Sequence, residues 1–177
     1  MKLYVARHCE TEWNARNKIC GRTDIPLTER GLAQAKILAE KTAGLDIDII
    51  IASPMIRAQQ TAAAVSEKCG IPVLTDERLI EQDFGIFEGM DRATPGYLVN
   101  KRMFAYRYPG GESHMDVAAR IYPLLDELRP RCLRENILLV CHGGVCRVIH
   151  TYFHSLTTEE YFLYQAPNAT LLEYHFT

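Results

Sequence analysis

The sequence predicts an α/β protein, a three-layer α/β/α sandwich with a largely parallel central sheet. Two observations carry this prediction. Short apolar or β-branched runs alternate along the chain with longer stretches of helical spacing, which is the pattern of strands joined by crossover helices. The strongest of these runs, at 48–52, is apolar almost throughout, as expected for a strand covered on both faces.

The predicted strands share an apolar run that ends at charged or turn-forming residues. The first ends at Arg7-His8, and the second stops at Ser53-Pro54, where a helix is expected to begin. A later run is bounded by Gly143-Gly144. In chain order, strands are predicted at 2–6, 48–52, 71–74, 136–141 and 170–175.

The predicted helices have recognisable ends. Thr28 is a suitable N-cap for a helix that runs to about Thr42. Gly70 ends the helix that follows the second strand, and Pro123 is expected to kink a later one. Helices are therefore predicted at 28–42, 55–68, 114–133 and 145–153.

Length and composition indicate one ordinary globular domain over residues 1–177, with 47% apolar and 24% charged residues. The net charge of −2, without a Lys/Arg-rich block, does not favour nucleic-acid binding. No apolar run approaches the ~20 residues of a membrane span, and the N-terminal run is too short for a signal peptide. A cytoplasmic location is the expectation, and nothing in the composition indicates an oligomeric state.

The cysteine pattern does not indicate a metal site or a disulfide framework. There is no CxxC pair, and the spacings match no zinc module. With a cytoplasmic location, reduced thiols are expected. The six cysteines are Cys9, Cys20, Cys69, Cys132, Cys141 and Cys146.

Three predicted strands lead into polar groups of one chemical kind. The first ends in Arg7-His8, the second leads to Arg57 in the first turn of a helix, and the fourth ends in His142 before two glycines. Ligands of parallel α/β sheets bind at the carboxyl ends of the strands. Two arginines, two histidines and a helix N-terminus at that edge would form a cationic pocket for a phosphoryl group.

The ordered motifs make the chain similar to the histidine phosphatase, or phosphoglycerate-mutase-like, superfamily. The resemblance extends over nearly the whole chain and implies a phosphoglycerate-mutase-like fold. The motifs that carry it are RHCETEWN at 7–14, GRTDIPLT at 21–28, Gly31, QA at 34–35, SP at 53–54, RA at 57–58, TA at 61–62, EQDFG at 81–85, EG at 88–89, GGES at 110–113 and CHGG at 141–144.

The resemblance also implies roles for individual residues. His8 would be the nucleophile that forms a phosphohistidine, and Arg7, Arg57 and His142 would complete the phosphate pocket. Glu81 would be the general acid and then the base that activates water. Secondary phosphate contacts would come from Asn14 and from the amides of Gly21 and Gly143. Two arginines supply the charge without a metal, so no metal and no cofactor are implied.

Two points stay open at the level of residues. Without the resemblance, Asp83 and Glu88 are as good candidates for the acid as Glu81. The irregular, aromatic and basic stretch at about 90–111 is expected to form a short lid, whose cations are either solvated or in contact with an acidic or aromatic substrate. The lid cations are Arg92, Lys101, Arg102 and Arg107, and the lid aromatic residues that could also contact the substrate are Tyr97, Phe104, Tyr106 and Tyr108.

Cys9 is a departure from the family pattern, which usually has glycine after the nucleophile. A thiol beside a cationic pocket would have a lowered pKa and would oxidise readily. The hypothesis from sequence is that Cys9 makes the activity sensitive to peroxide.

The motifs together with the short lid favour hydrolysis of a small phosphorylated metabolite. A lid stretch of only 19 residues, 90–108, should leave the phosphohistidine open to water. The alternatives are a 2,3-bisphosphoglycerate-dependent phosphoglycerate mutase and a phosphate-binding module without turnover. Sugar phosphates, phosphoglycerates, nucleotides and a ribazole phosphate all fit such a pocket. The expected partner is a small phosphomonoester, with no nucleic acid and no membrane.

Overall fold

A five-stranded, mostly parallel sheet forms the centre of the protein, whose computed structural model describes residues 2–176. The strands occur in the spatial order β3-β2-β4-β1-β5. All neighbours pair in parallel except β5, which lies antiparallel to β1 at one edge. The α/β prediction is confirmed. The strands are β1 (Leu3–Arg7), β2 (Ile49–Ala52), β3 (Val73–Thr75), β4 (Ile137–Cys141) and β5 (Leu171–Tyr174).

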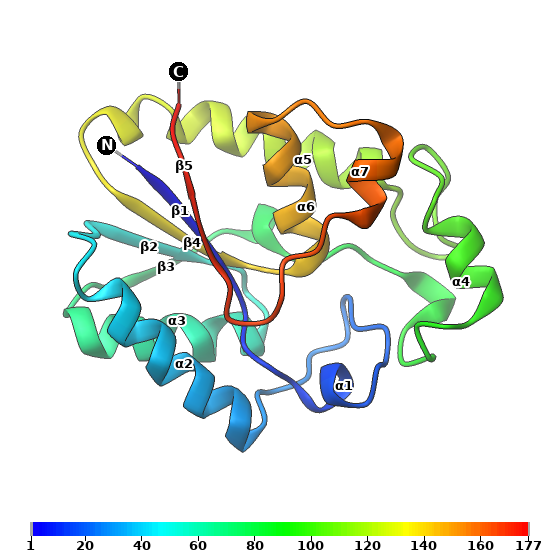
Figure 1. Ribbon diagram of the computed structural model, residues 1–177, viewed down its shortest axis with the longest axis horizontal. Helices are drawn as coiled ribbons and strands as arrows, with labels where there is room; N and C mark the ends of the chain where they lie inside the picture. Colours follow the sequence, from blue (N-terminus) through cyan, green and yellow to red (C-terminus); the bar gives the residue numbers. More distant parts are fainter. Residues whose placement is uncertain (1, 177) are drawn as a thin grey trace.

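Helices cover both faces of the sheet, and Figure 1 shows α2 and α3 on one face with α5 and α6 on the other. Alternate residues of β1 separate the two cores: Leu3 and Val5 pack with α5 and α6, whereas Tyr4 and Ala6 pack with α2 and α3. The helices are α1 (Glu12–Ala15), α2 (Glu29–Thr42), α3 (Ile56–Cys69), α4 (Pro95–Asn100), α5 (His114–Leu128), α6 (Gly143–Phe153) and α7 (Thr158–Leu163).

The long helices begin and end close to the predicted positions. Thr28 caps α2 through the amide of Gly31 at 2.9 Å, and Gly70 ends α3 in the left-handed conformation. The helix predicted at 114–133 is shorter: α5 ends at Leu128, with Pro123 inside it, and a separate 3-10 turn follows at Arg131–Leu133.

Three short helices were not predicted, because four to six residues are too few for an apolar period to show. Two of them, α1 and α7, begin with capping boxes at Thr11 and Thr157. The third, α4, lies inside the stretch predicted as an irregular lid. The capping residues at the starts of α1 and α7 were therefore the sequence feature from which these two helices could have been predicted.

The strand order brings the carboxyl ends of β2, β4 and β1 side by side. Two backbone hydrogen bonds extend the pairing beyond the strands, from the His8 amide to the Cys141 carbonyl and from the Ser53 amide to the Val140 carbonyl, both at 2.9 Å. The residues that follow the three strands are thereby fixed next to one another. No helix within residues 2–176 is long and apolar enough to cross a membrane.

Candidate active site

A cavity of about 320 Å³ lies at this edge of the sheet. Its wall combines the end of β1 with the start of α6 and with the loop that carries Glu81. Lid residues and the segment before β5 complete it. The predicted residues among its lining are Arg7, His8, Asn14, Glu81, Arg92, Lys101 and Gly143.

His8 is buried, and its ring is held in one tautomer. Nδ1 lies 2.7 Å from the carbonyl oxygen of Cys9. Because a carbonyl only accepts, Nδ1 carries the proton and Nε2 keeps its lone pair. Burial, followed by the charges of Arg7 and Arg57, holds the pKa of His8 well below its usual value. A neutral imidazole with a free ring nitrogen is the form that acts as a nucleophile.

Arg7 reaches the cavity from the end of β1 with part of its guanidinium unpaired. Nη1 donates to the carbonyl of Ala166 at 2.6 Å, whereas the buried Nε has no acceptor among residues 2–176. A Cβ at Gly143 would lie 3.4 Å from Cζ of Arg7, at ordinary van der Waals distance, so the start of α6 packs directly against this guanidinium. The Gly143 amide, first in α6, has no acceptor within its own helix. Both groups are suited to an anion.

Arg57 and His142 form a buried pair beside His8. Arg57 Nε donates to Nδ1 of His142 at 3.2 Å, so Nε2 of His142 carries the proton and donates to Ser53 Oγ at 2.7 Å. Burial, then Arg57 and His8, lowers the pKa of His142 well below its usual value. The His142 and His8 rings have centroids 5.1 Å apart. Neither Arg57 nor His142 lines the cavity, so the pair lies one layer behind it.

The three candidate acids occupy different places. Glu81 lines the cavity, and its carboxylate accepts from the amides of Gln82 at 2.8 Å and Gly144 at 3.0 Å. Asp83 instead accepts from the amide of Gly85 at 2.8 Å. Of the three carboxylates, only that of Glu81 belongs to the described wall of the cavity.

Glu88 binds the loop of residues 21–23. Its carboxylate accepts from the amides of Gly21 at 3.1 Å, Arg22 at 3.0 Å and Thr23 at 3.2 Å. The Gly21 amide, which the resemblance implies as a phosphate contact, is therefore already paired, and Gly21 does not line the cavity. Its carbonyl accepts from Arg57 Nη2 at 2.6 Å, so Gly21 supports the pocket arginine instead.

Asn14 is oriented through its amide oxygen. Oδ1 accepts from the Thr11 amide and from Nδ2 of Asn168, both at 3.2 Å. Asn168 also donates to the carbonyl of His8 at 2.9 Å, so it connects the two cavity residues. Asn168 was not predicted, since nothing in the sequence around it distinguishes it from a turn residue.

The lid cations divide into two pairs. Arg92 and Lys101 line the cavity, and burial, followed by the charges of Arg147 and Arg92, lowers the pKa of Lys101. Arg107 is exposed and pairs with Asp116 at 2.7 Å, and Arg102 is exposed too; neither lines the cavity.

Two further cavity residues, Arg147 and His114, were not predicted as site residues, whereas Tyr108 belongs to the lid stretch that was expected to contact a substrate. Arg147 of α6 lies over the Tyr161 ring at 5.5 Å and donates to the carbonyl of Tyr164 at 3.2 Å. The buried Tyr108 hydroxyl has no partner among residues 2–176. His114 is buried at the start of α5, close to where the helix at 114–133 was predicted to begin. A usable sequence signal existed only for Arg147. It lies four residues after Gly143, one turn further along the same helix, and so on the same face as the predicted site residue.

The environment expected for Cys9 is wrong. The thiol is buried in a cluster with Leu27 and Ala35 and does not line the cavity. Burial raises the pKa of Cys9 to about 11, which is opposite to the expected shift. Its backbone does not need glycine either, because Cys9 is not among the described residues with positive φ. Its amide donates to Thr61 Oγ1 at 3.1 Å.

Within the part of the chain that the structure describes, no three His, Cys, Asp or Glu side chains are grouped to hold a metal ion. Cys141 and Cys146 are buried with their sulfur atoms 3.6 Å apart, and their thiols are free. The described lining of the cavity combines arginine and lysine side chains with one carboxylate, that of Glu81.

Known proteins are similar to this chain over most of its length. The sequence model of the histidine phosphatase superfamily (branch 1) matches residues 3–177. A 2,3-bisphosphoglycerate-dependent phosphoglycerate mutase of Methylobacterium sp. (strain 4-46) is 37% identical over 171 residues, covering 89% of this chain and 82% of that protein.

Solved structures extend the similarity to phosphatases. A mycobacterial glucosyl-3-phosphoglycerate phosphatase, complexed with VO3, has a TM-score of 0.88 and 30% identity, with 97% of this chain and 90% of that chain covered. A phosphoserine phosphatase of Entamoeba histolytica, in complex with 3-phosphoglyceric acid, has a TM-score of 0.85 and 29% identity, with 97% of this chain and 89% of that chain covered.

Proposed function

The chain belongs to the histidine phosphatase superfamily, and we propose that it hydrolyses a small phosphomonoester through a phosphohistidine on His8. One observation carries the proposal: His8, whose Nε2 keeps its lone pair, and Arg7, whose Nε has no acceptor among the described residues, line the same cavity. An anion is the ligand that satisfies such a donor. The nucleophile and the charge that its target requires thus share one wall.

The proposed reaction divides into two transfers. Nε2 of His8 attacks phosphorus, the P–O bond to the leaving group breaks, and Glu81 gives that oxygen its proton. Water then attacks the phosphohistidine, Glu81 takes a proton from it, and phosphate leaves with His8 restored. Arg7 and the start of α6 hold the phosphoryl oxygens, while Arg57 adds charge from behind and the neutral His142 fixes the orientation of Arg57.

The substrate is proposed to carry a second anionic group. Arg92, Lys101 and Arg147 line the cavity, and none has a carboxylate partner among the described residues. Glu81 is the one acid of the described lining. This surplus of positive charge is larger than one phosphate requires. A carboxylate beside the phosphate, as in the 3-phosphoglyceric acid held by the Entamoeba relative, would balance it.

Two measurements test the proposal. Release of inorganic phosphate from a panel of sugar phosphates, phosphoglycerates, nucleotides and ribazole phosphate should identify substrates, and His8→Ala should remove the activity. A parallel assay with 3-phosphoglycerate and 2,3-bisphosphoglycerate distinguishes the mutase, which the 37% identical relative favours. Isomerisation without phosphate release would overturn hydrolysis. Tight vanadate binding without turnover of any substrate would indicate a phosphate-binding module.

A further inference from the structure

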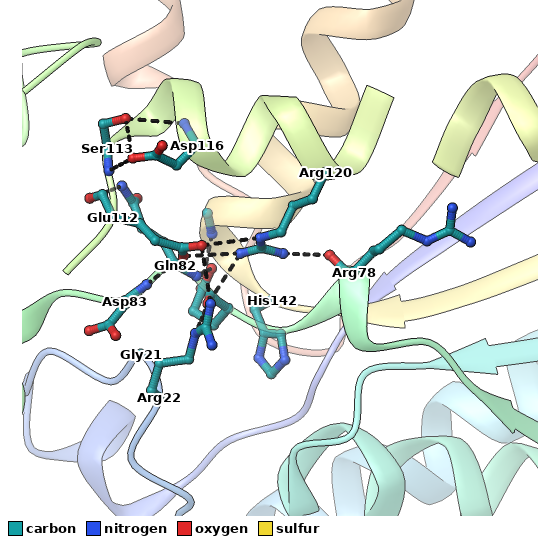
Figure 2. Close-up of polar contacts among 12 residues, drawn as sticks. Gly21, Arg22, Arg78, Gln82, Asp83, Glu112, Ser113, Asp116, Arg120 and His142 are labelled. Atoms are coloured by element: carbon teal, nitrogen blue, oxygen red, sulfur yellow. Dashed lines mark hydrogen bonds and ion pairs between the residues drawn. The ribbon is translucent and has the colours of Figure 1, made fainter. Parts of the chain in front are cut away.

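A network of charged side chains contacts the backbone of the Glu81 loop without lining the cavity. It joins three segments that are distant in sequence: the loop after α1, the loop before the lid and the start of α5. Figure 2 shows Arg120 extending from α5 between Arg78 on one side and Glu112 with Gln82 on the other. The members that matter here are Arg22, Arg120 and Glu112.

Two guanidinium groups converge on one carbonyl oxygen, that of Glu81. Arg22 Nε donates to it at 2.9 Å, and Arg120 Nη2 donates at 3.3 Å. Arg120 Nη1 also donates to the carbonyl of Arg78, three residues earlier. The main chain at the candidate acid is therefore held from two sides by planar forks, which fix direction as well as distance.

Glu112 connects these two arginines to each other and to the same loop. Its Oε1 lies 3.1 Å from Arg22 Nη2 and 3.4 Å from Arg120 Nε. Its Oε2 accepts from the amide of Asp83 at 3.0 Å and from Arg120 Nη2 at 3.3 Å. The backbone of Glu112 adds a bond from its amide to the Asp83 carbonyl at 2.9 Å and accepts from Gln82 Nε2 at 3.2 Å.

The side chains of the network are largely shielded from water, so its charge interactions are stronger than those of an exposed ion pair. The side chains of Arg120 and Glu112 are only 17% and 20% exposed. Burial raises the pKa of Glu112, but the Asp83 amide and the charges of Arg120 and Arg22 more than offset this, so the net pKa is lowered. Loss of the carboxylate would leave two like charges beside one carbonyl, and the side chains would separate.

We propose that Glu112 is a positioning residue for Glu81: through Arg22 and Arg120 it sets where the acid stands relative to the substrate's leaving oxygen. The inference rests on the proposed function of Glu81 as general acid. The Glu81 carboxylate is held by the amides of Gln82 and Gly144, and one of these belongs to its own loop. A shift of that loop would therefore move the acid, whereas Arg7 and His8 on β1 would stay in place.

The test compares substrates that differ in their need for an acid. An alkyl ester such as 3-phosphoglycerate needs protonation of its leaving oxygen, whereas p-nitrophenyl phosphate releases a stable phenolate. For Glu112→Gln we expect kcat/KM to fall about tenfold to a hundredfold with the alkyl ester and to change little with the aryl ester. Glu81→Gln should show the same selectivity more strongly. Glu135→Gln, which breaks an ion pair with Arg131 near the opposite end of β4, is the matched control.

The double variant supplies a second readout. Once Glu81 is glutamine there is no acid left to position, so adding Glu112→Gln should lower the alkyl-ester rate no further. Equal losses with both esters, or full additivity in the double variant, would overturn the positioning role while leaving hydrolysis intact. If Glu112→Gln does not fold, Arg22→Lys tests the same link, because its side chain is 36% exposed and only its fork is lost. A wild type inactive on every ester would instead refute the proposed function.

Discussion

Glu81 Oε2 accepts a hydrogen bond from the amide of Gly144 at 3.0 Å, which joins the candidate acid to the first turn of α6. Gly143, one residue earlier, lies against Arg7. The two glycines therefore contact two residues with different proposed roles. Gly143 lies beside Arg7, which is proposed to bind phosphate, and Gly144 binds Glu81, which is proposed to transfer the proton. A side chain at Gly144 would enter space that the Glu81 carboxylate occupies.

Gly144→Ala should displace Glu81 while leaving the fold intact. The added Cβ would lie 2.7 Å from Glu81 Oε1, which is closer than carbon and oxygen can approach. Because the obstructing atom ends a side chain, the carboxylate can yield. We expect kcat/KM with an alkyl phosphate to fall about tenfold to a hundredfold, with a nearly unchanged melting temperature. Gly44→Ala is the control, because a Cβ added at Gly44 would lie in open space, with no atom of a more distant residue within 4 Å. Unchanged kinetics in Gly144→Ala would contradict the placement of the acid.

Cys9→Ala should leave peroxide sensitivity unchanged. The buried thiol has a pKa of about 11, so little thiolate exists near neutral pH to react. The change should cost about 1 kcal/mol of stability, because it removes a sulfur from the cluster with Leu27 and Ala35. Residual activity after timed exposure to hydrogen peroxide measures the effect. Slower inactivation of the variant than of the wild type would show that Cys9 is a redox site after all.

His114 should make the protein less stable in mild acid. Its Nε2 donates to the Lys101 carbonyl at 3.0 Å, so Nδ1 accepts from the Tyr161 hydroxyl at 3.1 Å. Burial, opposed in part by the Lys101 carbonyl, lowers the pKa from 6.5 to about 4. The unfolded chain takes up the proton first as pH falls, so stability is complete above about 6.5 and is lost between 6.5 and 4.

His114→Gln should retain both hydrogen bonds and remove this titration. The free energy of unfolding, measured with urea, should fall between pH 7 and pH 4 in both proteins. The fall should be roughly 3 kcal/mol smaller in the variant than in the wild type. The remaining loss is expected from His8 and His142, whose pKa values are lowered in the same direction. An identical pH dependence in wild type and variant would mean that His114 titrates normally.

Arg147→Ala should weaken binding of substrates with two anionic groups. The lost contact is charge-assisted, so KM for 3-phosphoglycerate should rise about tenfold to a hundredfold. A phosphomonoester with no second anion, such as glycerol 2-phosphate, should be nearly unaffected. Arg107→Ala is the matched control, because that arginine pairs with Asp116 outside the cavity. Equal effects on both substrates would assign Arg147 to phosphate binding or to packing.

Part of the site could be predicted because strand ends are visible in sequence. Arg7, His8 and His142 each follow a buried run, and parallel neighbours bring such ends together. The direction of a side chain beyond the strand is not visible in this way. Cys9 follows His8 immediately, yet its side chain is buried with Leu27 and Ala35. Adjacency in sequence therefore gave the wrong environment for the thiol.

The outer wall of the cavity depends on tertiary contacts that have no local period. Lys101 is kept in place by a bond from His114 to its carbonyl, and Arg147 by stacking on Tyr161 of α7. Lys101 follows α4 and Tyr161 lies in α7, two short helices that the sequence pattern did not indicate. The roles of Arg22, Arg120 and Glu112 were hidden for the same reason, since Arg22 and Arg120 reach the Glu81 carbonyl, and Glu112 reaches the Asp83 amide, from segments distant in sequence.

The most direct test is to trap the phosphoenzyme. Wild-type protein is mixed with a radiolabelled substrate, quenched in alkali and digested, and the labelled peptide is sequenced. We predict an alkali-stable, acid-labile label on His8, absent from His8→Ala and accumulating in Glu81→Gln when an aryl phosphate is used. A label on another residue, or steady turnover by His8→Ala, would contradict the central claim that His8 carries the phosphoryl group.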